Sequence, residues 1–149
     1  MTIGAICSRE VVITERDTPV SELARLMREQ RVGSVVITHF DGNGNTPIGL
    51  VTDRDIAISI VADGIDPEEV TAGDLCRQPL VNALESEPIG DVLKRMRQHG
   101  VRRVPVVNKP GHLIGIVAVD DVLDLLASEL SDLAAVLVQE QRNEAIKVG

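Results

Sequence analysis

The chain contains a twofold internal repeat, and this repeat limits its possible folds more than any other feature. In the early part of each copy, matching residues recur at an offset of 69: Cys7 with Cys76, Pro19 with Pro88, Met27 with Met96 and Val32 with Val101. Further along, the offset is 66: Gly49 with Gly115, Val51 with Val117 and Asp55 with Asp121. A repeat of this length indicates one supersecondary unit built twice, each copy burying its apolar face against the other.

The three-residue difference lies in one loop of each copy. Residues 39–46 and Asn108–His112 are rich in turn-forming residues and follow short β-branched runs. Such loops are typical of β-hairpins, whose tips tolerate insertions because they face solvent. We therefore predict paired strands at Ser34–Thr38 with Ile48–Thr52, and at Val104–Val107 with Leu113–Ala118.

The segments around these hairpins predict one further strand and two helices per copy. Residues Val11–Thr14 suit a short strand, after which Thr18 suits a helix N-cap and Pro19 the first helical position. The helices that follow should bury one amphipathic face, formed by Val20, Leu23, Ala24 and Met27 in the first copy and by Ile89, Val92, Leu93 and Met96 in the second. We expect the closing helices at about Asp53–Ala62 and about Asp120–Gln141.

Each copy is thus predicted to be a βαββα unit, which gives an α+β fold. We assign a first repeat at residues 1–62, a polar linker at 63–73, a second repeat at 74–127 and a C-terminal helical extension at 128–149. A unit of about 60 residues is marginal alone. The two repeats should therefore pack sheet to sheet around a shared cleft.

The charge and composition exclude several classes of partner. A net charge of −8 disfavours nucleic acid and anionic membranes as the main partner. Phe40 is the only aromatic residue, so a bound heterocycle must be held by aliphatic side chains. No apolar run approaches the ~20 residues of a spanning helix, and the N-terminus lacks a secretory signal, so we expect a cytoplasmic protein. Cys7 and Cys76 are predicted packing positions, with a redox pair as the alternative.

Two motifs add specificity to the repeat. One is the strand-to-helix junction Gly49-Leu50-Val51-Thr52-Asp53-Arg54-Asp55, and the other is the run from His99 to Val107 in the second copy. With these motifs the chain resembles a tandem pair of cystathionine beta-synthase (CBS) domains, called a Bateman module, from about Ile6 to about Leu126. The resemblance implies a regulatory module that binds AMP, ADP, ATP or S-adenosylmethionine between the copies.

The resemblance also implies roles for individual residues. In the family's Gly-x-x-Thr-x-x-Asp pattern the Thr and Asp hold the ribose hydroxyls, and these are Thr52 and Asp55 here. Basic residues near the second strand of the family commonly meet the phosphates, which implies Arg102 and Arg103, with Arg54 as a third candidate. The second copy keeps Asp121 but has Ala118 in place of the threonine. Near the adenine, Ile13 and Asn82 occupy strand positions where the family often has threonine.

Several of these residues have explanations that need no ligand. Thr52 and Asp55 also form the pattern of a helix capping box. Arg102 and Arg103 are adjacent, so in a strand they would point to opposite faces and at most one would face a given cleft. Asp121 is also explained as an acid at a helix start, where the neighbouring Asp120 is an alternative cap.

The sequence shows no catalytic or metal-binding pattern. The three histidines, His39, His99 and His112, lack the close Cys/His spacing of a zinc site. No nucleophile, acid–base pair or phosphate-binding glycine loop is evident, so we do not expect an enzyme. The two hypotheses are an adenosine-ligand sensor and a ligand-free pair that serves as an interaction module, and either would act on a separate target protein. A stripe at Leu126, Leu130, Leu133 and Leu137 predicts a homodimer.

Overall fold

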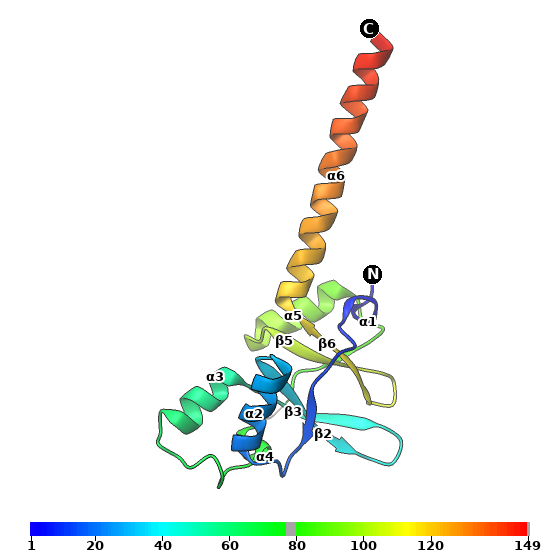
Figure 1. Cartoon of the computed structure of the whole chain (residues 1–149). Helices are drawn as coiled ribbons and strands as arrows, with labels where there is room; N and C mark the ends of the chain where they lie inside the picture. The colour runs from blue at the N-terminus through cyan, green and yellow to red at the C-terminus, as the bar shows by residue number, and fades with distance from the viewer. Residues whose placement is uncertain (77–79, 149) are drawn as a thin grey trace. The chain divides into compact units, whose positions relative to one another are not determined.

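The computed structural model describes residues 1–76 and 80–148, which form two units, Met1–Val117 and Ala118–Gly149. The second unit is built on one helix, α6 (Val119–Val148). The first unit contains both sheets (Figure 1). In chain order its elements are α1 (Ile3–Ile6), β1 (Ile13–Glu15), α2 (Val20–Gln30), β2 (Ser34–Phe40), β3 (Asn45–Thr52), α3 (Asp53–Ile56), the π-helical turn η1 (Ala57–Val61), α4 (Ala72–Leu75), β4 (Ala83–Leu84), α5 (Ile89–His99), β5 (Arg103–Val107) and β6 (Leu113–Ala118).

The two sheets have the same topology. Their strand orders are β1-β2-β3 and β4-β5-β6, so the central strand of each sheet is the first strand of the hairpin. The opening strand pairs in parallel with this central strand in both sheets, Ile13 lying opposite Val36 and Ala83 opposite Val106. The predicted α+β fold of two repeats with a long C-terminal helix is confirmed.

The core lies between the central strands and the first long helix of each repeat. Val35 and Ile37 on β2 are fully buried and cluster with Leu23 on α2, while Val36, also buried, points to the opposite face of the strand. Burying such a side chain contributes roughly 1.5–3 kcal/mol. The amphipathic helices are confirmed, because their buried residues are Val20, Leu23 and Met27 in α2 and Val92 and Met96 in α5. Ala24, which was also expected on the buried face of α2, is exposed.

The start of α2 differs from the prediction. The helix begins at Val20, so Pro19 occupies the N-cap position and no side chain caps the first turn. The hydroxyl of Thr18 instead lies 2.7 Å from that of Thr14. Thr18 was therefore wrongly expected to be the N-cap, because a local hydroxyl–hydroxyl bond satisfies it outside the helix.

Each repeat opens with a short helix that the sequence patterns did not predict. These are α1 and α4, and each docks on the other repeat. The backbone N–H of Gly4 donates to Glu85 O (2.9 Å), while that of Ala72 donates to Thr18 O (2.8 Å). Helix α4 also begins inside the segment assigned as a linker. A four-residue helix gives no periodic apolar signal, which is why both escaped prediction.

The two cysteines explain why glycine precedes each closing helix. A Cβ added at Gly49 would lie 2.1 Å from Cys76 Sγ, and one at Gly115 would lie 2.7 Å from Cys7 Sγ. Both thiols are free, and burial raises the pKa of each. The cysteines are therefore protonated packing residues, as predicted, and each contacts the opposite repeat.

A second contact joins the repeats at the hairpin tips. His112 Nε2 lies 2.7 Å from Asp41 Oδ2, and a Cβ at Gly44 would meet the His112 ring. Hydrogen bonds from the Asn43 backbone, and then from His112, lower the pKa of Asp41 to about 2. This contact lies at the ends of the strands remote from the β3–α3 junction, so the hairpins are tied together away from that junction.

Candidate functional site

The junction between β3 and α3 fixes two polar side chains. Thr52 is the N-cap of α3, and its Oγ1 accepts a hydrogen bond from the Asp55 N–H at 3.1 Å. Asp55 Oδ2 accepts from the Thr52 N–H at 2.9 Å. This is the predicted capping box. The box uses Thr52 Oγ1 only as an acceptor, so the hydroxyl proton is not needed for it, and a carboxylate can accept more than one bond.

These two residues line a cavity of about 340 Å³, which we call the first cavity. Its size falls within the range of small-molecule sites, roughly 300–1,000 Å³. Both repeats contribute to it, and its lining combines three chemistries. The residues are aliphatic at Leu50, Leu80, Val81 and Val101, polar or acidic at Thr52, Asp53 and Asp55, and cationic at Arg54, Arg102 and Arg103, with Gly100 completing the wall.

Both adjacent arginines line this cavity, so the prediction that only one would face a given cleft was wrong. The physical reason is that β5 begins at Arg103, and Arg102 lies in the bend before it, where strand alternation does not apply. Arg102 is exposed and Arg103 is half-buried. The Arg103 guanidinium makes no hydrogen bond or ion pair with another residue that the structure describes.

The remaining predicted residues lie elsewhere. Ile13 is on β1, 37% exposed, and is not among the described residues that line the first cavity. Asn82 lines a neighbouring cavity of about 330 Å³. Asp121 lies, exposed, in the first turn of α6, in the second unit. Leu80 and Val81 were missed, although the apolar pair just ahead of Asn82 was a signal for them.

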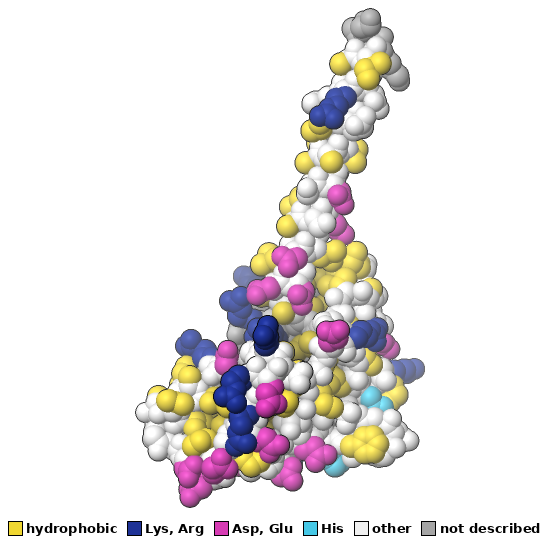
Figure 2. Space-filling view, viewed as in Figure 1, with side chains coloured by type: hydrophobic (Ala, Val, Ile, Leu, Met, Phe, Trp, Pro, Cys, Tyr) yellow, Lys and Arg dark blue, Asp and Glu magenta, His cyan; other side chains and the backbone are white. Residues whose placement is uncertain are grey.

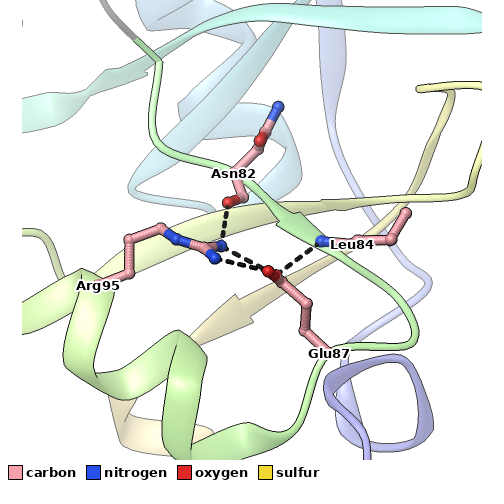
Figure 3. A network of polar contacts seen from close by, with 4 residues as sticks. All are labelled: Asn82, Leu84, Glu87 and Arg95. Atoms are coloured by element: carbon pink, nitrogen blue, oxygen red, sulfur yellow. Dashed lines mark hydrogen bonds and ion pairs between the residues drawn. The ribbon is translucent and has the colours of Figure 1, made fainter.

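A network beside that neighbouring cavity occupies one further arginine (Figure 3). Arg95 Nη1 donates to Asn82 O and to Glu87 Oε2, both at 2.9 Å, and Nη2 pairs with Glu87 Oε1. Glu87 also accepts from the Leu84 N–H at 3.0 Å, and the hydrogen bonds from Arg95 lower its pKa. Arg95 is therefore engaged in joining α5 to β4.

A second cavity, of about 260 Å³, lies at the position related to the first cavity by the internal repeat. Under the repeat offsets most of its residues correspond to residues of the first cavity. Gly33 replaces Arg102, and Ser34 replaces Arg103, yet Arg103 itself lines both cavities. The full lining is Glu10, Val11, Val12, Arg31, Val32, Gly33, Ser34, Val36, Arg103 and Ile116.

Comparison with known proteins identifies the family. The sequence profile of the CBS domain matches residues 3–62 and 72–128. The chain belongs to the CBS domain family. It is 36% identical over 125 residues to an uncharacterized protein of Methanopyrus kandleri, an alignment that spans 84% of this chain and 62% of that protein. The tandem arrangement inferred from the repeat is confirmed.

Two solved structures of CBS proteins are close in fold. Hypoxic Response Protein I, described with two coordinated zinc ions, shares 32% identity at a TM-score of 0.73, covering 83% of this chain and 98% of that one. The CBS domain protein PAE2072 from Pyrobaculum aerophilum, complexed with AMP, shares 29% at a TM-score of 0.72, covering 81% and 89%.

The described residues, 1–76 and 80–148, also bear on metal and membrane binding. Within these residues no three or more His, Cys, Asp or Glu side chains are grouped so that they could hold a metal ion. No helix in the same part of the chain combines the length and apolar character needed to cross a membrane.

Proposed function

We propose that the first cavity binds an adenine nucleotide, AMP, ADP or ATP, and that the protein is a regulatory module which signals occupancy to a separate target protein. The observation that carries this proposal is that the cavity is lined by three kinds of side chain. Aliphatic, sugar-binding and cationic groups meet in one space of about 340 Å³. These are the three chemistries that a base, a ribose and a phosphate require.

Each part of the nucleotide has a counterpart in the cavity. Leu50, Leu80 and Val81 would clamp the adenine between aliphatic surfaces, since none of the described residues that line the cavity is aromatic. Thr52 and Asp55 would hold the ribose hydroxyls, because a carboxylate accepts from both and a threonine hydroxyl can donate or accept. The complex of PAE2072 with AMP supports an adenosine ligand here.

The cationic residues favour a phosphate-bearing ligand. Arg54, Arg102 and Arg103 outnumber the acids Asp53 and Asp55 in the lining. Hydrogen bonds from a guanidinium to a phosphate are charge-assisted and can be bidentate. S-adenosylmethionine has a net positive charge and only one carboxylate to pair with these arginines, so we place it behind the nucleotides.

Signalling requires that the nucleotide prefer one conformation of the module over another, because a ligand with equal affinity for two states shifts neither. The cavity is lined by both repeats, so the nucleotide would contact both at once. We propose that occupancy changes the arrangement of the repeats and, through it, a surface read by the target. The proposal includes no catalytic step.

Thermal unfolding with added ligand tests this function. At 100 times its Kd a ligand stabilises the native state by roughly 2.7 kcal/mol, which for a chain of this size raises Tm by about 5–10 °C. We expect this shift with AMP, ADP or ATP, and a smaller one with adenosine. The chain has no Trp or Tyr, so calorimetry or a dye-reported melt is the suitable method.

An unchanged Tm with every adenosine ligand would contradict the proposal. It would favour the alternative, a ligand-free pair that acts as an interaction module. The observation behind that alternative is the capping box itself, since the mutual hydrogen bonds of Thr52 and Asp55 stabilise the start of α3 without a ligand.

A further inference from the structure

Helix α6 carries a regular apolar seam that the proposed nucleotide function does not use. The helix is 30 residues long and contains no glycine or proline. From Val119 to Leu137 it repeats large apolar residues at alternating spacings of four and three: Val119, Leu123, Leu126, Leu130, Leu133 and Leu137. This is the a/d spacing of a coiled coil, in which apolar residues recur on average every 3.5 residues.

The seam is exposed to solvent for most of its length. Leu123, Leu130 and Leu133 are 59%, 66% and 60% exposed, and Leu126 and Leu137 are 46% and 56% exposed. Figure 2 shows hydrophobic side chains along the visible face of the helix. Contiguous apolar surface of this extent marks an interaction site. Helices also owe most of their stability to packing of such a face.

The residues beside and beyond the seam indicate another helix as the partner. Ala127 and Ala134 follow the d residues Leu126 and Leu133, at a flanking position where a small side chain lets a second helix approach closely. At the next d and a positions the seam ends in Glu140 and Glu144. A partner must therefore match about 27 Å of helix, the length of 18 residues at a rise of ~1.5 Å, and must have the same period.

A second copy of this chain meets both requirements, and the charges determine its direction. In a parallel pair, Glu140 and Glu144 would face their own copies across the seam, and the acidic first turns with Asp120 and Asp121 would adjoin. An antiparallel pair moves each of these acids away from its own copy and leaves Glu140 of one chain about one helical turn beyond the level of Asp120 of the other. It also aligns all six apolar residues when Leu126 of one chain lies opposite Leu130 of the other.

We propose that α6 is a dimerisation element, which pairs antiparallel with α6 of a second copy through the seam from Val119 to Leu137. The proposal is independent of the nucleotide function, because none of the described residues that line the first cavity belongs to α6. An aspartate in the middle of the seam would be buried without a partner and should separate the chains.

Sedimentation of the full-length protein tests the seam. Wild type is expected to be a dimer, and Leu130→Asp should raise the dimer dissociation constant by at least about 100-fold. Val138→Asp is the matched control, since Val138 is also apolar and 48% exposed but lies off the seam; it should sediment as wild type does. Circular dichroism and nucleotide binding of each variant would verify that the protein remains folded.

A concentration-independent wild-type monomer would overturn the proposal, because the seam would then be covered by its own chain. A dimer unaffected by Leu130→Asp would also overturn it, as would an assembly larger than a dimer. Cross-linking tests the direction, in a background with Cys7 and Cys76 changed to Ala. Leu126→Cys should form disulfides with Leu130→Cys of a differently tagged chain and not with itself, and self-linking would overturn the antiparallel arrangement.

Discussion

The two cavities arise from equivalent positions of one repeat, yet they differ in what they can hold. Both have aliphatic walls, and among the described lining residues of each cavity the arginines outnumber the acids by one. The first cavity is also lined by Thr52 and Asp55. Their equivalents in the second repeat, Ala118 and Asp121, are not among the described residues that line the second cavity. The net charge of the lining therefore does not distinguish the two cavities. The difference lies in Thr52 and Asp55, the proposed ribose ligands, and in the positions of the arginines.

The position of the arginines gives the largest predicted effect. Changing Arg102 and Arg103 together to Gln should weaken AMP binding by about 100-fold or more, because each charged hydrogen bond contributes roughly 1.5–3 kcal/mol. Binding of adenosine, which has no phosphate, should change far less, and isothermal titration of both ligands measures the difference. Equal losses for AMP and adenosine would show that the arginines do not meet the phosphate.

The proposed ribose-binding role of Thr52 and Asp55 can be tested separately from their capping role because the chain contains a second capping box. Thr71 and Asp74 form it at the start of α4, where hydrogen bonds from Thr71 lower the pKa of Asp74. Asp55→Ala should weaken nucleotide binding by about 1–3 kcal/mol, whereas Asp74→Ala should leave it unchanged. Both should lower the free energy of unfolding by about 0.5–2 kcal/mol.

Titration and chemical denaturation of these two variants give the two readouts. If Asp74→Ala weakened binding as much as Asp55→Ala does, capping alone would explain the effect. The ribose role of Asp55 would then be withdrawn.

The equivalent glycines Gly49 and Gly115 allow a comparison of how tightly the segments that carry Cys76 and Cys7 pack on the opposite repeat. Alanine at either position overpacks the cysteine of the opposite repeat, and overpacking typically destabilises by about 1–3 kcal/mol. A Cβ added at Gly49 would meet mainly the Cys76 side chain, whereas one added at Gly115 would also lie 2.6 Å from the backbone oxygen of Ser8. Cys76→Gly should therefore partly rescue Gly49→Ala, while Cys7→Gly should not rescue Gly115→Ala.

A double-mutant cycle by denaturant unfolding measures both couplings. Equal rescue at the two positions would contradict the assigned contacts. No effect of either alanine would mean that the docked segments yield easily.

The sequence was sufficient for much of this molecule, and the exceptions have physical causes. Periodicity and the repeat offsets gave the long helices and the hairpins, because burial imposes a regular pattern there. The docking of α1 and α4 on the opposite repeats was not predictable, since it depends on backbone hydrogen bonds that leave no periodic signal in the sequence. Thr52 and Asp55 were placed through the family motif, but Leu80 and Val81 were missed because their role depends on where β4 begins. That Arg102 and Arg103 both line the cavity was likewise not predictable, because it depends on β5 beginning at Arg103.

The smallest predicted effect concerns the residue that ends the first long helix of each repeat. Arg31 and Gly100 are equivalent, and both adopt the left-handed conformation, with φ of 55° and 63°. For a residue with a Cβ this conformation costs roughly 1 kcal/mol or more relative to glycine. Arg31→Gly should therefore stabilise the protein by about 1 kcal/mol, and Gly100→Ala should destabilise it by a similar amount, as measured by urea unfolding. Arg31 also lines the second cavity, so its strained backbone conformation places a cationic side chain beside that cavity. Stabilisation without any change in AMP affinity would place nucleotide binding in the first cavity alone, whereas a loss of affinity would show that the second cavity also takes an anion.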